Sequence, residues 1–372
     1  MDIHYGDVLI KYGSILDATD NTIPHIISGH ESTNYDYLQD GDIIVADTAE
    51  DETVGKTIEL LNISGRKIEA GLHTVPCRPL FPFASMYLGY YMNTSHYHKQ
   101  LIPLMQGIKV LSISKGNISK TKISSPQTIA EQEKISRFLY LLDQRAAAQS
   151  KIIDALKKYK RGVFEAIFTR NLRLVPKARQ SDWTAFKLSD FATRITRKNN
   201  GATDIPLTIS AQYGLIDQRD FFSKVVASSD MSGYYLLHRD EYAYNRSTSN
   251  DYPFGSIKRL ELYNEGAVST LYLCFAIKED VVLSNLAKWY FESSQWHRGV
   301  NEICAEGARN HGLLNVPTDG FFDTVHILPS NIEEQAQIAA FLSRVHDKLA
   351  KAQEELDKLI GLRNGLMQQL FI

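Results

Sequence analysis

Apolar and polar positions follow the same pattern in two long stretches of the chain. Residues 126–168 read PQTIAEQEKISRFLYLLDQRAAAQSKIIDALKKYKRGVFEAIF, and residues 329–371 read PSNIEEQAQIAAFLSRVHDKLAKAQEELDKLIGLRNGLMQQLF. The two stretches align without a gap, at an offset that is a whole number of heptads. Identical pairs include Glu131/Glu334, Gln132/Gln335, Ile135/Ile338, Leu139/Leu342, Leu156/Leu359 and Phe168/Phe371. Such a match indicates an internal duplication rather than two unrelated surface helices.

Within each stretch, apolar residues recur at alternating spacings of four and three, which is typical of the seam of a coiled coil. The seam positions of the first stretch are Ile135, Leu139, Leu142, Ala146, Ile153, Leu156, Val163 and Ile167. Those of the second are Ile338, Leu342, Val345, Leu349, Ala352, Leu356, Leu359, Leu366 and Leu370. The pattern predicts two long helices, one over residues 126–170 and one over 329–372. A lone helix of about 60 Å cannot bury such a seam, so the two are expected to pack together.

Two seam positions of the first stretch carry polar residues. Gln149 aligns with Ala352, and Lys160 aligns with Arg363, so a cation is retained at one inward-leaning position in both copies. A long cationic side chain at the border of a seam can pack its stem and keep its charge in water. We favour that interpretation over a contact with a partner protein.

Residues 1–125 are expected to form a first globular head. HYGDVLIKYGSIL, DGDIIVADTAE and GKTIELLNI alternate apolar and polar residues between Gly and Asp turns and therefore predict strands. FASMYLGYYMNTSHYHKQLIPLMQ has helical spacing with a break at Asn93. GIKVLSISKGNISKTKI then predicts a glycine-opened basic loop that leads to a short strand.

A basic linker over residues 171–182 leads to a second globular head at 183–328. IPLTIS, EYAYNRS, SIKRLELY and STLYLCFAI predict strands, and VVLSNLAKWYFESSQWHRGVNEI predicts one or two helices. A second Gly-basic loop, AEGARNHGLLNV, precedes the strand-like FFDTVHIL. Both heads thus follow one order: strands, helix, Gly-basic loop, strand, proline and long helix.

The two heads differ at their start. The second opens with WTAFKLSDFATRI, for which the first half shows no counterpart, because Met1 is followed almost at once by HYGDVLIKY. We therefore expect the first head to be shortened at its N-terminus.

Composition and motifs give little indication of a catalytic site. The chain has a net charge of −2, three scattered cysteines and no long apolar run, so we expect a cytoplasmic protein without a membrane segment. No phosphate-binding loop, dinucleotide fingerprint or nucleophile-elbow motif is present. The acidic turn at residues 47–52 and the pair His96/His98 fit a solvated surface better than a metal site. The sequence thus predicts neither a metal site nor an enzyme, although an unfamiliar nuclease stays open.

Two heads carried by a spacer suit a target with two separated sites, such as duplex DNA. Bases are read by side chains such as Arg, Lys, Asn and Gln, and phosphates by basic side chains and backbone N–H groups. In the first head the candidate DNA contacts are Lys109, Ser112, Ser114 and Lys115. In the second head they are Tyr244, Asn245, Arg246, Gly307, Arg309 and His311.

At this point the chain resembles the DNA-specificity subunit of type I restriction-modification systems. The resemblance rests on P-x-x-I-x-E-Q-x-x-I-x-x-F-L opening each long helix, on a closing Leu/Ile-Phe, and on the placement of both helices after a head. LTISAQYGLIDQRDFF, YAYNRS and GARNHGLLNV resemble one class of target-recognition domain. YGDVLIKYGSIL, ADTAEDETVGK, AGLHTVPCRP and GIKVLSISK resemble another.

The resemblance implies an α+β fold with two mixed α/β target-recognition domains separated by two long antiparallel coiled-coil helices. It implies that each domain reads half of a split DNA sequence, that the helices set the gap, and that the chain itself is not an enzyme. Expected partners are double-stranded DNA, two modification (methyltransferase) subunits and restriction subunits. S-adenosylmethionine, ATP and magnesium would belong to those partners, and no cofactor to this chain. Two alternatives stay open: a coiled-coil scaffold that binds only proteins, and a truncated or recombining allele.

Overall fold

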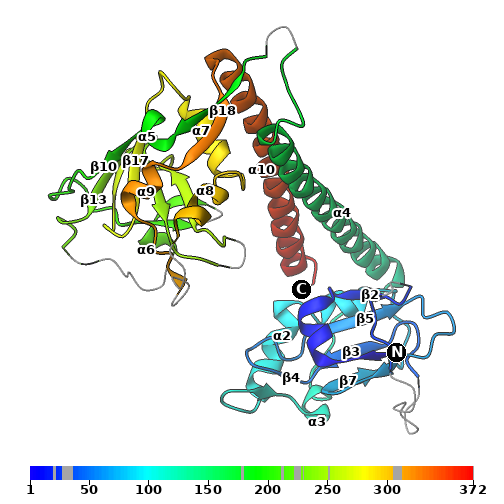
Figure 1. The fold of residues 1–372 in the computed structure, drawn as a ribbon. Helices are drawn as coiled ribbons and strands as arrows, with labels where there is room; N and C mark the ends of the chain where they lie inside the picture. The colour runs from blue at the N-terminus through cyan, green and yellow to red at the C-terminus, as the bar shows by residue number, and fades with distance from the viewer. Residues whose placement is uncertain are drawn as a thin grey trace. The chain divides into compact units, whose positions relative to one another are not determined.

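The computed structural model describes residues 1–19, 22–26, 37–176, 180–210, 213–221, 228, 230–249, 252–304 and 312–371. The chain divides into two compact units. Unit 1 comprises Met1–Ile152 and Ala352–Ile372, and unit 2 comprises Ile153–Lys351. Each unit therefore contains one head together with a part of each long helix (Figure 1).

The long helices are α4, Ile129–Phe168, and α10, Ile332–Gln369. Within unit 1, Gln149 donates a 2.9 Å hydrogen bond to the carbonyl of Ala352, and Arg145 pairs with Glu355. Within unit 2, Lys160 lies 3.2 Å from His346. In unit 1, positions advancing along α4 meet positions receding along α10, so the two helices run antiparallel there.

The predicted seam is confirmed by the burial of its side chains. Leu139, Ile153, Val163 and Ile167 of α4 are buried, as are Ile338, Leu342, Val345, Ala352 and Leu359 of α10. Ile135, Leu142, Leu156, Leu349 and Leu356 are half-buried. We call α4 and α10 together the helix pair.

The first head is built on a sheet in the order β2-β5-β3-β7. The strands are β2, Ile15–Asp17; β3, Ile43–Ala46; β5, Thr57–Leu61; and β7, Thr74–Cys77. β2 runs parallel to β5, and the other neighbours are antiparallel. The smaller pairs are β1, Asp2–Ile3, with β6, Glu69–Ala70, and β4, Thr48–Ala49, with β8, Leu111–Ser112. The helices are α1, Tyr87–Tyr91; α2, Ser95–Leu101; the 3-10 turn η2, Ile102–Leu104; and α3, Lys115–Ile118.

The central strand β3 is buried on both faces. Ile43 and Val45 pack towards α1, α2 and Phe371, whereas Ile44 and Ala46 pack into a second core. That second core includes Val8, which lies on η1, a short π-helix over Asp7–Lys11. The strand predicted across HYGDVLIKY is therefore wrong. Val8 and Tyr12 are buried four residues apart, which is a helical spacing that the apparent alternation concealed.

The second head has a sheet in the order β10-β17-β14-β15, antiparallel throughout. The strands are β10, Ala192–Ile195; β14, Tyr242–Asn245; β15, Ser256–Arg259; and β17, Leu273–Ile277. The smaller pairs are β9, Trp183–Lys187, with β18, Val325–Pro329; β11, Leu207–Ser210, with β12, Gly214–Asp217; and β13, Tyr235–His238, with β16, Glu265–Val268. The helices are α5, Leu188–Phe191; α6, Gln218–Phe221; α7, Ser284–Phe291; α8, His297–Ile303; and α9, Thr318–Phe322.

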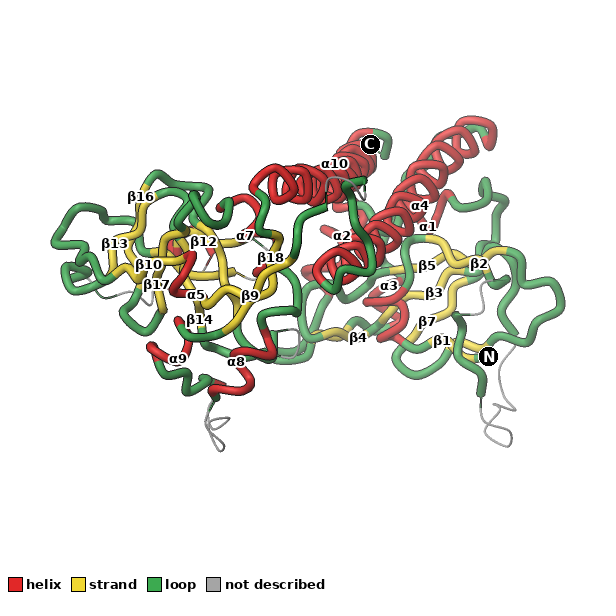
Figure 2. The backbone as a smooth tube through the Cα atoms, turned by 45° about the horizontal axis from the view of Figure 1, so that its top comes forward, coloured by secondary structure: helices red, strands yellow, loops and turns green. Residues whose placement is uncertain are grey.

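Sheets with short helices in both heads, together with the two long helices, confirm the predicted α+β class. Figure 2 shows the strands gathered within each head and the long helices as continuous coils. The sheets share a three-strand motif in which β3, β5 and β7 correspond to β14, β15 and β17. The fourth strand differs, since β2 is added beside β5 and β10 beside β17.

Candidate nucleic-acid interface

The basic loop of the first head is a short hairpin beside β4. Gln106 and Ser112 exchange backbone hydrogen bonds of 2.9 and 2.8 Å, and β8 pairs with β4. Gly107 adopts a φ of +122°, and a Cβ at this position would lie 1.9 Å from the carbonyl oxygen of Val110. Glycine is therefore required here, and the hairpin presents Lys109 and Ser112 as exposed residues.

Ser114 and Lys115 follow this hairpin at the start of α3. The Ser114 hydroxyl caps the helix by accepting from the Asn117 N–H, and both residues are exposed. Ile113, which precedes Ser114, is buried and donates its N–H to the Asp47 carbonyl at 2.8 Å. All four candidate contacts of the first head thus lie exposed on one short, anchored segment.

Tyr244 of the second head is not exposed, and its assignment as a DNA contact is a correction. Its ring is fully buried, stacks on Phe321 at 4.9 Å and meets Trp296 edge-on. Its hydroxyl donates to the Phe254 carbonyl at 2.8 Å. Because β14 is covered on both faces, its polar-looking YAYN sequence belongs to the interior.

Asn245 and Arg246 lie at the end of the same strand and organise the loops there. Asn245 accepts from the Ser247 N–H at 3.0 Å. Arg246 donates to the carbonyl oxygens of Leu271 at 3.0 Å and Val316 at 3.4 Å. Both are half-buried, so their exposed atoms can face a ligand, but their hydrogen bonds hold loops together.

Gly307, Arg309 and His311 lie outside the described residues. Their C-terminal flank is described, and the Thr248 N–H donates to the Gly312 carbonyl at 2.7 Å. Ser247 forms an isolated bridge with Leu313. In the first head, Thr48 pairs with Ser112 in the same way. The residues that follow the central strand therefore pair with the basic hairpin in the first head and with Gly312 and Leu313 in the second.

A buried glutamine attaches each head to the helix pair. Gln132 accepts from the Ala84 N–H at 3.0 Å and donates to the Pro126 carbonyl at 2.9 Å. Gln335 accepts from the Leu283 N–H at 2.7 Å and donates to the Pro329 carbonyl at 2.9 Å. The sequence marked these positions only by their identity in the two copies.

The terminal phenylalanine of each helix packs on a head. In unit 1, Phe371 meets Tyr87 and Tyr91 at ring-centroid distances of 5.4 and 5.9 Å. In unit 2, Phe168 meets Tyr290 at 5.3 Å. Each head is therefore held by the start of one long helix and by the end of the other.

The two retained cations differ in their partners. In unit 1, Arg363 lies 2.9 Å from Asp143, which also accepts from the Tyr90 hydroxyl at 2.8 Å. In unit 2, Lys160 lies beside the imidazole of His346 and the ring of Trp289, the latter at 5.7 Å, and neither of these groups is a carboxylate. Both cations therefore contact the opposite helix, and they are not simply edge residues that extend into water.

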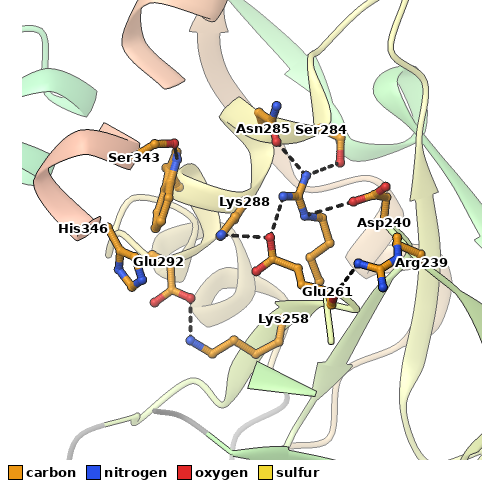
Figure 3. Close-up of polar contacts among 12 residues, drawn as sticks. Arg239, Asp240, Lys258, Glu261, Ser284, Asn285, Lys288, Glu292, Ser343 and His346 are labelled. Atoms are coloured by element: carbon orange, nitrogen blue, oxygen red, sulfur yellow. Dashed lines mark hydrogen bonds and ion pairs between the residues drawn. The ribbon is translucent and has the colours of Figure 1, made fainter. Parts of the chain in front are cut away.

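A network of hydrogen bonds and ion pairs lies beside His346 in the second head (Figure 3). Glu261 accepts from Arg259 at 2.6 Å and from Lys288 at 2.9 Å. Lys258 pairs with Glu292. Burial, and then Lys160 and Lys288, lower the pKa of His346, so the ring is neutral at pH 7.

The first head contains a pocket of about 570 Å³ that includes Glu59, Asp42 and Arg78. Glu59 accepts from the backbone N–H groups of Met86 and Gly89, and burial raises its pKa to about 7. Asp42 is paired with Arg78. Both carboxylates thus serve the fold.

Within the described ranges, no group of three or more His, Cys, Asp or Glu side chains could hold a metal ion. Among those same residues, no helix is long and apolar enough to cross a membrane.

No family model matches the chain, and no curated protein sequence matches it. Solved structures share its fold. The S subunit of a type I restriction-modification system from M. genitalium aligns with a TM-score of 0.52 at 11% identity, covering 96% of this chain and 88% of that chain. A chain from a structure reported as the basis of complex assembly and conformational transition of the type I R-M system aligns with a TM-score of 0.56 at 13% identity, covering 96% and 90%. The likeness at these identities is one of fold.

Proposed function

We propose that this chain is the DNA-specificity subunit of a type I restriction-modification complex, in which each head reads one half of a bipartite sequence. The observation that carries the proposal is the duplicated attachment of two heads to the helix pair, in a fold shared with a solved S subunit and with a chain of a type I R-M structure. Two readers on one spacer match a target with two separated half-sites. The chain itself acts as a non-catalytic binding subunit.

The candidate reading surface is the basic segment beside the residues that follow the central strand of each sheet. In the first head, Lys109, Ser112 and Lys115 are exposed on it. The major groove admits a two-stranded β-ribbon, and lysine and hydroxyl groups can hydrogen-bond base edges there. The matching segment of the second head contains Arg309 and His311, which keep their assignment as candidate contacts.

The helix pair is proposed to set the gap and to bind two modification subunits. Many of its seam residues are buried, and some of them, such as Leu139, Ile167 and Ile338, pack into the core of a head. Apolar side chains stay exposed elsewhere on α4, including Phe138, Leu141, Ile152 and Tyr159, at 47%, 55%, 50% and 52%. Exposed apolar side chains on a helix surface favour a protein partner.

The catalytic steps are assigned to other chains. Modification subunits would supply S-adenosylmethionine chemistry, and restriction subunits would use ATP and magnesium. The net charge of −2 fits a subunit whose partners contribute much of the attraction to phosphates. A cytoplasmic location follows from this role.

Sequencing for modified bases in cells that express this chain with its modification subunit tests the proposal. We expect one bipartite methylated motif with a fixed gap. Lys109→Ala should reduce methylation through one half-site, with a binding loss on the order of 1–3 kcal/mol if Lys109 reads a base. Equal loss on all sequences would make Lys109 a phosphate contact.

A soluble complex that methylates no motif would contradict the proposal and favour a protein-binding scaffold. DNA cleavage by the purified chain alone would instead identify an enzyme. Both outcomes are readable from the same preparations.

A further inference from the structure

The hairpin of the first head carries an apolar tip. Ile108 is 100% exposed and Val110 is 51% exposed, on either side of the exposed Lys109. Full exposure of an isoleucine gains nothing for folding, because its apolar surface stays in water. The tip is therefore available for a ligand, and it contributes no core packing.

This tip is held in a defined position. The paired backbone bonds between Gln106 and Ser112 close the hairpin, and the close approach of Gly107 to Val110 shapes its turn. The base is anchored by the bond from the Ile113 N–H to the Asp47 carbonyl and by the bond from Asn117 to the Leu104 carbonyl at 3.0 Å. A hairpin held in this way loses little conformational freedom when it binds.

The surroundings of the tip are cationic. Lys109 lies between the two apolar side chains, and Lys115 and Lys120 are exposed on the segment that follows. Cations around an apolar tip favour a polyanion that also offers apolar groups. In the major groove of DNA the only methyl group on the base edges is that of thymine, and apolar side chains read it.

We propose that Ile108 is a specificity-determining residue that contacts the 5-methyl group of a thymine in the half-site read by the first head. This inference rests on the proposed DNA-reading function and adds a base type to it. Lys109 and Lys115 bind the flanking backbone or base edges, and Ile108 supplies discrimination that neither lysine can give.

The test uses the full chain assembled with its modification subunits. The synthetic duplexes are unmethylated and carry the motif found by sequencing for modified bases. Each thymine of the motif is replaced in turn by deoxyuridine, which lacks only the methyl group. For the chain without an amino-acid substitution, one deoxyuridine replacement should weaken binding about fourfold, which corresponds to one buried methyl group. For Ile108→Ala, binding to the thymine duplex should fall about tenfold, and the same deoxyuridine replacement should have no further effect.

Ile10→Ala is the matched control, because Ile10 is 88% exposed in the same head and lies outside the hairpin. It should retain both the affinity and the deoxyuridine effect. The inference is overturned if no thymine replacement matters, if the motif contains no thymine on either strand, or if Ile108→Ala keeps the full deoxyuridine effect. Absence of any sequence preference in the unmodified complex would instead overturn the proposed function.

Discussion

The starts of the two long helices carry the same Glu-Gln pair but use the glutamate differently. Glu334 is buried and accepts from Arg173 at 2.7 Å, from the Ser181 N–H at 2.8 Å and from the Ser181 hydroxyl at 2.6 Å. Glu131, its counterpart in the first copy, is exposed. Identical residues at equivalent positions thus have different structural roles, because the linker and the opening strand of the second head supply the partners of Glu334.

The same opening segment changes the edge of the sheet. In the second head, β10 pairs with the outer side of β17. In the first head, the corresponding strand β7 ends the sheet and contains Pro76, and proline is tolerated at the edge of a sheet because it cannot donate to a neighbouring strand. The glutamine attachment is common to both heads, and the opening segment is an addition to it.

The largest predicted effect is on stability, and it should separate the two glutamates. Glu334→Ala should lower the free energy of unfolding by about 2–4 kcal/mol, because it leaves the partly buried Arg173 and the Ser181 N–H without their partner. Glu131→Ala, the matched control, should change it by less than about 0.5 kcal/mol. Denaturant unfolding, with hydrogen exchange to locate the loss in residues 171–187, measures both.

The effect should depend on acid pH. Burial opposes ionisation of Glu334, but the bonds from Ser181 and the charge of Arg173 outweigh it and lower the pKa. Since the folded-state pKa lies below the unfolded value of about 4.3, the contribution is present above that pH and is lost as pH falls through the folded pKa. Equal sensitivity of the two alanine variants would contradict this account.

A smaller effect on stability concerns Lys160 and Arg363, the cations at equivalent positions of the two long helices. His346→Asp would give Lys160 the carboxylate that Arg363 already has in Asp143, and we expect a gain of about 0.5–1 kcal/mol, reduced by lost packing on Trp289. His346 has a lowered pKa, so its neutral form stabilises the fold above about pH 6.5, and that contribution is lost as pH falls below this value. The variant should lose this dependence between pH 6.5 and the folded pKa. Thermal unfolding across pH 5–8 reports it, and unchanged pH dependence would contradict the assignment.

The sequence predicted the features that depend on periodicity. Alternating spacings of four and three located the seam, because an apolar stripe on a long helix has to be buried, here partly against the heads. Gln149 was noted there as an exception, and its bond to the Ala352 carbonyl explains how a polar group is accommodated. The Gly-basic hairpin was also located correctly, because Gly107 is required by its turn.

Features that depend on burial by elements distant in the sequence were not predictable in the same way. The local sequence predicts a surface position for Tyr244, because nothing in it shows that both faces of β14 are covered. The partners of Gln132 lie at Ala84 and Pro126, and no local pattern links them. The sequence alone does not distinguish Ile108 from a core isoleucine, and only its exposure in the fold identifies it as a surface tip.

The most direct test of the central claim is the gap between methylated half-sites in a chain with a longer helix pair. One heptad is inserted between residues 152 and 153 and one between residues 351 and 352, so that the seam register is kept in both helices. Seven residues add about 10 Å, or about three base pairs of DNA. The account predicts the same two half-sequences with a gap longer by about that amount. The same gap as in the unmodified chain would contradict it, as would a change in either half-sequence.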